Sequence, residues 1–217
     1  MTNEILLYAG AAIAAAAAYL TVAPRILRRH YKFPVPLFVA SFLDSRLRKT
    51  MQPPHKIVER SGIQEAMTVM ELGCGPGTYT LDIARAVGDG GRIYAVDIQR
   101  AMIDKLEKKL QKPENRDVQN VIPKVANAYE LPLPEDCLDS VVLICALQEI
   151  PDRQRALGEL YRVLRPRGVL AVSEWAVDPD YPLRGTTKRI CEQAGFKLRE
   201  SRGNLFHYTL QFEKPSQ

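Results

Sequence analysis

Two acidic side chains bracket a glycine-rich turn, and their types suit a positively charged ligand. Gly73, Gly75 and Gly77 follow the apolar run 67–72, which has the length of a strand, and Glu71 stands two residues before the first glycine. Glycines let the backbone turn tightly and approach a ligand with no Cβ between them. A carboxylate at Glu71 would repel a pyrophosphate group but would attract a cationic amino-acid group.

The second acid, Asp97, ends another strand-like run at 91–97, twenty residues after Gly77. An acid at the end of the second strand of such a unit can accept hydrogen bonds from two ribose hydroxyls. The glycines are spaced G-x-G-x-G, whereas dinucleotide-binding enzymes use G-x-G-x-x-G. The chain also has no Tyr-x-x-x-Lys proton relay. These features argue against an NAD-dependent oxidoreductase.

The segments 71–77 (ELGCGPG) and 94–97 (YAVD) together resemble the class I S-adenosylmethionine (SAM)-dependent methyltransferases, including those of quinone biosynthesis. The late run LGELYRVLRPRG at 157–168 is similar to a further signature of that family. The resemblance covers roughly residues 55–215. It implies a Rossmann-like methyltransferase fold, with SAM as cofactor and no required metal.

The same resemblance implies a set of residues that contact the cofactor. Asp97 would bind the ribose, Ile98 would pack on the adenine, and the backbone of Leu143 would accept from the methionine ammonium. Asn127 and Ala128 would flank the adenine, although Asn127 stands where relatives often have Asp and could instead only shape a turn. The full predicted set is Glu71, Gly73, Gly75, Gly77, Thr78, Asp97, Ile98, Asn127, Ala128 and Leu143.

The catalytic side of the site is less defined. Relatives often carry L-H-x-[IV]-x-D after the fourth strand, and this chain has Gln148 in place of the histidine. The change removes the obvious base for work near neutral pH. Glu149 is a candidate to orient or deprotonate an acceptor, or it only caps a helix or faces solvent. The catalytic residue is therefore left open between Gln148, Glu149 and others.

Alternating strands and helices would position these residues. Strands are expected at 67–72, 91–97, 118–125, 138–146, 169–175, 196–200 and 205–212, and helices near 79–87, 102–110, 156–164 and 186–194. This alternation predicts an α/β fold, a doubly wound and mostly parallel sheet of seven strands. A turn is expected at 165–168, and the last two strands should form a hairpin in which the final strand is antiparallel.

The N-terminal residues 5–23 are uncharged and almost wholly apolar. As a helix they would span roughly 28 Å, near the thickness of the hydrocarbon core of a bilayer. The cations follow the stretch, at Arg25, Arg28, Arg29 and Lys32, rather than preceding it. This order favours a single-pass membrane anchor that leaves the catalytic domain in the cytoplasm. The alternatives are an Ala-rich helix packed on protein and a cleaved signal.

Three segments are predicted: a hydrophobic helix with its basic flank at 1–32, juxtamembrane cap helices at 33–62, and the methyltransferase domain at 63–217. Residues 37–49 have the pattern of an amphipathic helix with a basic end. Such a helix could lie on anionic lipid headgroups, or it could cover the sheet edge and the substrate entrance. A short helix is expected from Pro53 to Arg60, with His55 at its surface.

Charge and composition narrow the possible partners. The net charge is +5, and nine Lys and Arg against two acids fall between residues 24 and 60, so the domain itself is nearly neutral. This distribution argues against a nucleic-acid-binding face on the domain. A lipid-soluble acceptor is expected, such as a quinone precursor, a phospholipid headgroup, a thiol or a phenol. The alternatives are a soluble acceptor with an incidental tether and a non-catalytic SAM-binding scaffold. The oligomeric state is left open.

Overall fold

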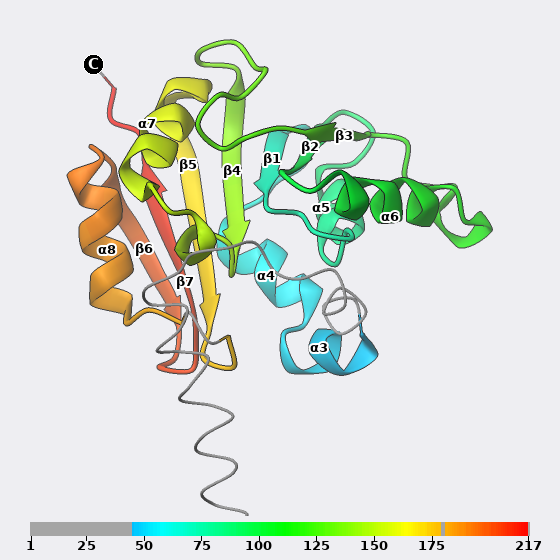
Figure 1. Cartoon of the computed structure of the whole chain (residues 1–217), viewed down its shortest axis with the longest axis horizontal. Coiled ribbons are helices and arrows are strands. Elements are labelled where there is room, and N and C mark those ends of the chain that lie inside the picture. The colour runs from blue at the N-terminus through cyan, green and yellow to red at the C-terminus, as the bar shows by residue number, and fades with distance from the viewer. Residues whose placement is uncertain (1–44, 179–180, 217) are drawn as a thin grey trace, which may run out of the picture.

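A computed structural model of the chain describes residues 45–178 and 181–216 (Figure 1). The helices are α3 (Arg46–Met51), α4 (Pro54–Ser61), α5 (Thr80–Val87), α6 (Arg100–Leu110), α7 (Arg153–Val163) and α8 (Arg184–Gln193), with short 3-10 turns at Pro113–Asn115 and Leu147–Glu149. The strands are β1 (Thr68–Leu72), β2 (Arg92–Asp97), β3 (Val121–Val125), β4 (Leu138–Ile144), β5 (Leu164–Trp175), β6 (Lys197–Gly203) and β7 (His207–Glu213).

The seven strands form one sheet in the order β3-β2-β1-β4-β5-β7-β6. The pairs among β1 to β5 are parallel, whereas β7 runs antiparallel to both β5 and β6. The predicted doubly wound, mostly parallel sheet with a closing hairpin is thus confirmed. The order changes direction between β1 and β4, and in open α/β sheets ligands bind at the carboxyl ends of strands beside such a point.

Two apolar layers cover the sheet because neighbouring residues of a strand point to opposite faces. Met70 and Leu72 of β1 pack in the layer under α7 and α8. Val69, between them, packs in the opposite layer with residues of α4 and α5. Figure 1 shows α3 and α4 in the lower half of the molecule, to the right of the lower end of β5.

Three sequence predictions need correction. Ser45 has an extended backbone and its side chain accepts from the Arg48 amide, so a helix begins at Arg46 and the expected continuous helix at 37–49 is wrong. The expected turn at 165–168 lies inside β5, where Arg167 has a positive φ of 64° and the pairing with β4 shifts register. The third strand begins at Val121, because the amide of Val118 instead closes a turn on Asn115.

Among the helices of the described residues, none is both long and apolar enough to cross a bilayer. The predicted anchor at 5–23 and its basic flank lie outside the described residues.

Candidate functional site

The glycine turn lies at the carboxyl end of β1 and is fastened to the neighbouring strand. The amides of Gly73 and Cys74 both donate to the carbonyl oxygen of Val96, at 2.8 and 3.1 Å. Gly73, Gly75 and Gly77 all have positive φ angles, between 54° and 77°. Residues with a Cβ rarely adopt this conformation, so the glycines are required by the path of the chain.

A cavity of about 290 Å³ opens above this turn. Nine of the predicted residues line it, drawn from the ends of β1, β2 and β4 and the loops that follow them. They are Glu71, Gly73, Gly75, Thr78, Asp97, Ile98, Asn127, Ala128 and Glu149. Tertiary structure thus brings together residues that are up to 78 positions apart in the sequence.

Glu71 is a buried acid at the floor of the cavity. It is 2% exposed, and its Oε2 accepts a hydrogen bond from Thr80 Oγ1 at 2.5 Å. Burial raises the pKa of Glu71 to about 7, although the Thr80 bond and the charge of Lys109 oppose that rise. A carboxyl group with this pKa gains its charge most readily when a cation lies beside it.

Asp97 holds the glycine turn and the start of the following loop. Its Oδ2 accepts from the Gly75 amide at 2.9 Å, and its Oδ1 accepts from the Gln99 amide at 2.8 Å. Burial raises the pKa of Asp97, while these backbone donors oppose the rise. Each carboxylate oxygen can accept more than one hydrogen bond, so both remain able to receive a ligand hydroxyl.

The predicted adenine contacts lie beside Asp97. Ile98 is an apolar side chain that is 53% exposed where it borders the cavity, which is a surface that a flat apolar ring could cover. The Oδ1 of Asn127 accepts from the Tyr129 amide at 3.1 Å. The alternative reading of Asn127 as a turn-forming residue is therefore observed, in a residue that also lines the cavity.

Gly77, Leu143 and Gln148 do not line the cavity. A Cβ at Gly77 would lie 2.5 Å from Leu106 Cδ1, so this glycine allows α6 to pack closely. Leu143 is buried inside β4, where it pairs with Val172, and the strand reaches the cavity only at Ile144. The chain reaches the cavity at Ile144, Cys145 and Ala146, which are one to three residues beyond the predicted Leu143.

Gln148 does not line the cavity and makes a hydrogen bond within the protein. It is buried, and its Oε1 accepts from Arg153 Nη1 at 2.7 Å. Of the two catalytic candidates, only Glu149 lines the cavity. Gln148, which replaces the histidine of relatives, thus accepts a hydrogen bond from Arg153 at the start of α7.

Several residues that line the cavity were missed. Arg48, Tyr79, Cys145 and Asp178 border it from α3, the start of α5, the end of β4 and the loop after β5. Arg48 belongs to the basic run that the sequence had suggested would face lipid. Arg48 of α3 lines the cavity, which agrees with the prediction that this segment covers the substrate entrance, while the predicted contact with lipid headgroups stays a prediction. Of these four residues, only Tyr79 could have been identified from the sequence, because it stands two residues after Gly77 of the glycine turn.

The residues around the cavity fit SAM. A Cβ built on Gly75 would meet no atom of the described residues within 4 Å, so this part of the molecule leaves the space above the glycine open to a ligand. The buried acid Glu71 suits the positive charges of SAM, and Asp97 suits its ribose. The exposed face of Ile98 suits its adenine. When bound, SAM supplies an electrophilic methyl group.

Alanine substitutions at Gly75 and Gly77 should distinguish a glycine that leaves space for the ligand from one that allows α6 to pack closely. We expect Gly75→Ala to weaken binding of S-adenosylhomocysteine about tenfold or more, since the methyl group enters the cavity, with a stability loss of only about 1 kcal/mol from its φ. Gly77→Ala should lower the free energy of unfolding by about 2 kcal/mol or more, because its Cβ collides with Leu106. Isothermal titration and urea denaturation measure the two quantities. Equal affinity for Gly75→Ala and wild type would contradict the assignment.

Comparisons with known proteins agree with this geometry. The methyltransferase domain family matches residues 63–212. The chain is 32% identical over 148 residues to a ubiquinone/menaquinone biosynthesis C-methyltransferase of Vibrio campbellii, covering 68% of this chain and 55% of that protein. It is 35% identical over 119 residues to the protein of that name from Enterobacter sp., covering 55% and 47%. The chain thus spans about half the length of the curated relatives it matches.

Solved structures share the fold. A SAM-dependent methyltransferase from Aquifex aeolicus superposes with a TM-score of 0.76 at 23% identity, covering 83% of this chain and 99% of that one. One from Methanosarcina mazei superposes with a TM-score of 0.63 at 20% identity, covering 74% and 98%. At these identities the likeness concerns the arrangement of strands and helices.

Proposed function

This chain belongs to the methyltransferase domain family, and we propose that it is a SAM-dependent methyltransferase that acts on a hydrophobic small molecule of the quinone-precursor or phenol type at a membrane surface. The observation that carries the proposal is that Glu71, Asp97 and the open space above Gly75 belong to one cavity, which also has an apolar wall. Met102, Ile150 and Pro151 belong to that wall.

The residues that line the cavity would contribute mainly by positioning the cofactor and the acceptor. Asp97 and the glycine turn would hold the cofactor, and the apolar wall would hold the acceptor and exclude water. Fixing two reactants in a productive geometry can supply about 7–11 kcal/mol of a barrier. Glu149 is the candidate to hold a proton of the acceptor, because it lines the cavity whereas Gln148 does not.

The curated relatives support an acceptor of low polarity, since their names describe C-methylation in quinone biosynthesis. That specificity is theirs, and for this chain it guides the choice of substrate to test. A phenol or quinol ring would suit a cavity whose walls are mainly apolar and include the rings of Tyr79 and Tyr129.

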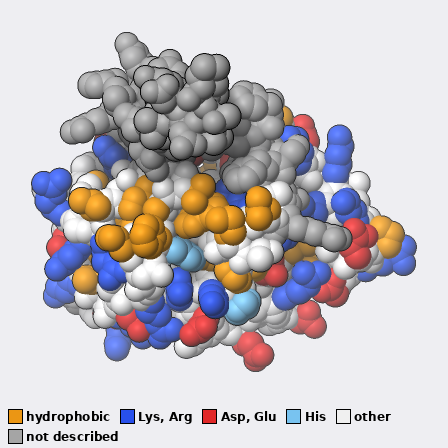
Figure 2. Space-filling model, turned by 90° about the horizontal axis from the view of Figure 1, so that it is seen from below, with side chains coloured by type: hydrophobic (Ala, Val, Ile, Leu, Met, Phe, Trp, Pro, Cys, Tyr) orange, Lys and Arg blue, Asp and Glu red, His pale blue; other side chains and the backbone are white. Residues whose placement is uncertain are grey.

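An apolar surface supports the approach of such an acceptor from a membrane. Figure 2 shows hydrophobic side chains gathered across the lower face of the molecule, among Lys and Arg side chains. The exposed apolar residues of α3 and of the nearby loops are Leu47, Met51, Val177, Leu183, Leu205 and Phe206. The loop after β5 and the β6–β7 turn are joined by a hydrogen bond from the Ala176 amide to the Phe206 carbonyl at 2.7 Å. Together with the apolar stretch 5–23, this face supports the proposed membrane placement, with the domain on the cytoplasmic side.

The experiment incubates the full chain with methyl-labelled SAM and vesicles made from a bacterial lipid extract, and then floats the vesicles on a density gradient. We expect the protein to float with the vesicles and label to enter the lipid-soluble fraction. Asp97→Ala serves as the control without cofactor binding. Label only among water-soluble molecules would favour the soluble acceptor. Binding of S-adenosylhomocysteine without any transfer would favour the non-catalytic scaffold.

A further inference from the structure

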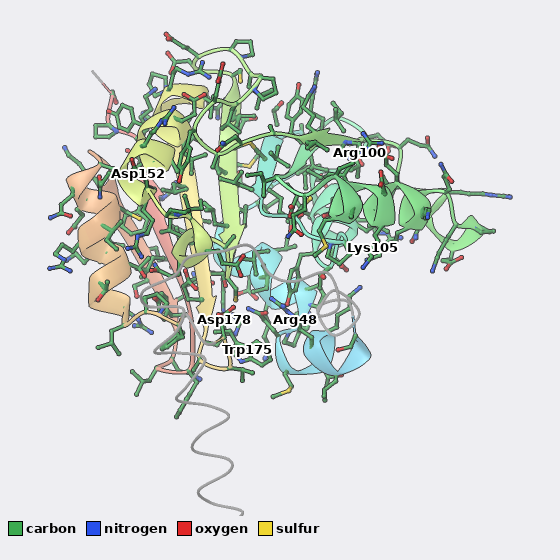
Figure 3. All side chains as sticks on the ribbon, in the orientation of Figure 1. Arg48, Arg100, Lys105, Asp152, Trp175 and Asp178 are labelled. Carbon is green, nitrogen blue, oxygen red and sulfur yellow. The ribbon has the colours of Figure 1, made fainter. Side chains whose placement is uncertain are left out.

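A positively charged side chain is buried at the edge of the cavity. Arg48, on α3, is only 7% exposed and lines the cavity together with Tyr79, Cys145 and Asp178. Figure 3 shows Arg48, Trp175 and Asp178 close together where α3 approaches the end of β5. A buried guanidinium at a ligand cavity requires a partner for its charge, because the loss of hydration is costly.

The residues that the structure describes supply few partners for the Arg48 charge. Arg48 Nε donates to the hydroxyl of Tyr79 at 3.4 Å, and the guanidinium lies 5.8 Å from the Tyr79 ring and 5.9 Å from the Trp175 ring. Within residues 45–178 and 181–216, no carboxylate lies within 4.0 Å of Arg48, and no hydrogen bond involves either of its Nη atoms. Its two terminal nitrogens therefore have donor capacity left for a ligand.

The charges near Arg48 do not neutralise it. Burial opposes the positive charge, yet the pKa of Arg48 is raised by Cys145, Tyr79 and Asp178. Burial also raises the pKa of Cys145 well above its ordinary range and that of Tyr79 to about 12, so both are uncharged at neutral pH. Asp178 is then the one acid among these three neighbours, and no ion pair within 4.0 Å joins its carboxylate to the Arg48 guanidinium.

A chain of buried polar groups fixes the position of the guanidinium. The Tyr79 hydroxyl that receives the Arg48 bond donates to Gln52 Oε1 at 2.6 Å. Gln52 Nε2 lies 3.3 Å from His207 Nε2, and His207 Nδ1 lies 3.3 Å from Arg60 Nη1. Burial, followed by the charges of Arg60 and Lys56, lowers the pKa of His207 to about 4, so this histidine is neutral at pH 7. The donors of Arg48 are thus held in place without a ligand.

We propose that Arg48 binds an oxyanion, a carboxylate or phenolate, of a ligand in the cavity. A planar guanidinium whose Nη atoms have no hydrogen-bond partner among the described residues matches two oxygens of one such group. The inference rests on the proposed function, which offers two sources: the amino-acid carboxylate of SAM and the oxyanion of the acceptor. The first is favoured because Arg48 and the buried acid Glu71 both line the same cavity. A cation and an acid that line one cavity suit an amino-acid group that carries both a carboxylate and an ammonium.

The test compares wild type, Arg48→Gln, Arg48→Lys and the surface control Arg199→Gln. Titration calorimetry measures binding of S-adenosylhomocysteine and of 5′-methylthioadenosine, which shares the nucleoside and sulfur but lacks the carboxylate. We expect Arg48→Gln to weaken S-adenosylhomocysteine binding about 10- to 100-fold, to leave 5′-methylthioadenosine unchanged, and Arg48→Lys to recover part of the loss. Arg199→Gln, an exposed arginine on β6, should bind both like wild type.

The second arm measures methyl transfer from labelled SAM at increasing acceptor concentration. Unchanged S-adenosylhomocysteine binding with at least a tenfold rise in the acceptor KM would assign Arg48 to the acceptor. Equal loss for both nucleosides, or no change in either arm, would overturn the proposal. If Arg48→Gln does not fold, Arg48→Lys carries the same comparison. A wild-type protein that binds neither nucleoside would instead refute the proposed function.

Discussion

Replacing Asp97 with alanine is expected to lower the affinity for S-adenosylhomocysteine by about 100-fold or more. The substitution removes an acceptor for two ribose hydroxyls, and a hydrogen bond to a charged group contributes about 1.5–3 kcal/mol. It also releases the Gly75 and Gln99 amides, which the carboxylate now holds at 2.9 and 2.8 Å. Isothermal titration calorimetry at pH 7.5 measures the affinity.

Asp139→Ala is the matched control. The Asp139 carboxylate also accepts from a backbone amide, that of Thr68 at 2.6 Å, but this contact lies at the opposite end of β1 from the glycine turn. We expect Asp139→Ala to lose stability in urea denaturation while retaining wild-type affinity. If Asp97→Ala binds as tightly as Asp139→Ala, the ribose assignment is wrong.

Replacing Glu71 with glutamine is expected to change how stability and SAM affinity depend on pH. Burial raises the pKa of Glu71 to about 7 from an ordinary value of 4.5. Because the folded pKa is the higher one, the associated stability is fully present below pH 4.5 and is lost as the pH rises through about 7. Glu71→Gln should therefore gain about 3 kcal/mol relative to wild type between pH 4.5 and pH 8. Urea denaturation of the ligand-free protein at both pH values measures the difference.

SAM binding should have the opposite pH dependence. The ionised form of Glu71 attracts the positive charges of SAM, so wild-type affinity should rise about tenfold between pH 6 and pH 8. Glu71→Gln should show a nearly flat profile, whereas Glu114→Gln, an exposed acid on the Pro113–Asn115 turn, should follow wild type. A flat wild-type profile, or an unchanged slope in Glu71→Gln, would show that Glu71 does not sense the ligand.

The N-terminal half of the candidate site was predictable from the sequence because its determinants are local. A strand, a glycine turn and a helix are adjacent in the chain, and the acids Glu71 and Asp97 stand at fixed offsets from that turn. The period-two and helical patterns also predicted the seven strands, with boundaries that moved by a few residues. Short-range backbone geometry determines such features before any long-range contact forms.

The rest of the cavity wall depended on contacts between distant segments. Arg48 faces the cavity because Ser45 starts a new helix there and because Tyr79 and Trp175, 31 and 127 residues later, pack against it. In the sequence it is one cation in a basic run. Pairing within the sheet likewise decided that β4 meets the cavity from Ile144 onward and not at Leu143. The sequence by itself indicated the cofactor through its motifs, and only the packing of α3 against the ends of α5 and β5 placed a buried cation at the cavity. The physical reason is that burial and side-chain direction are properties of the assembled core.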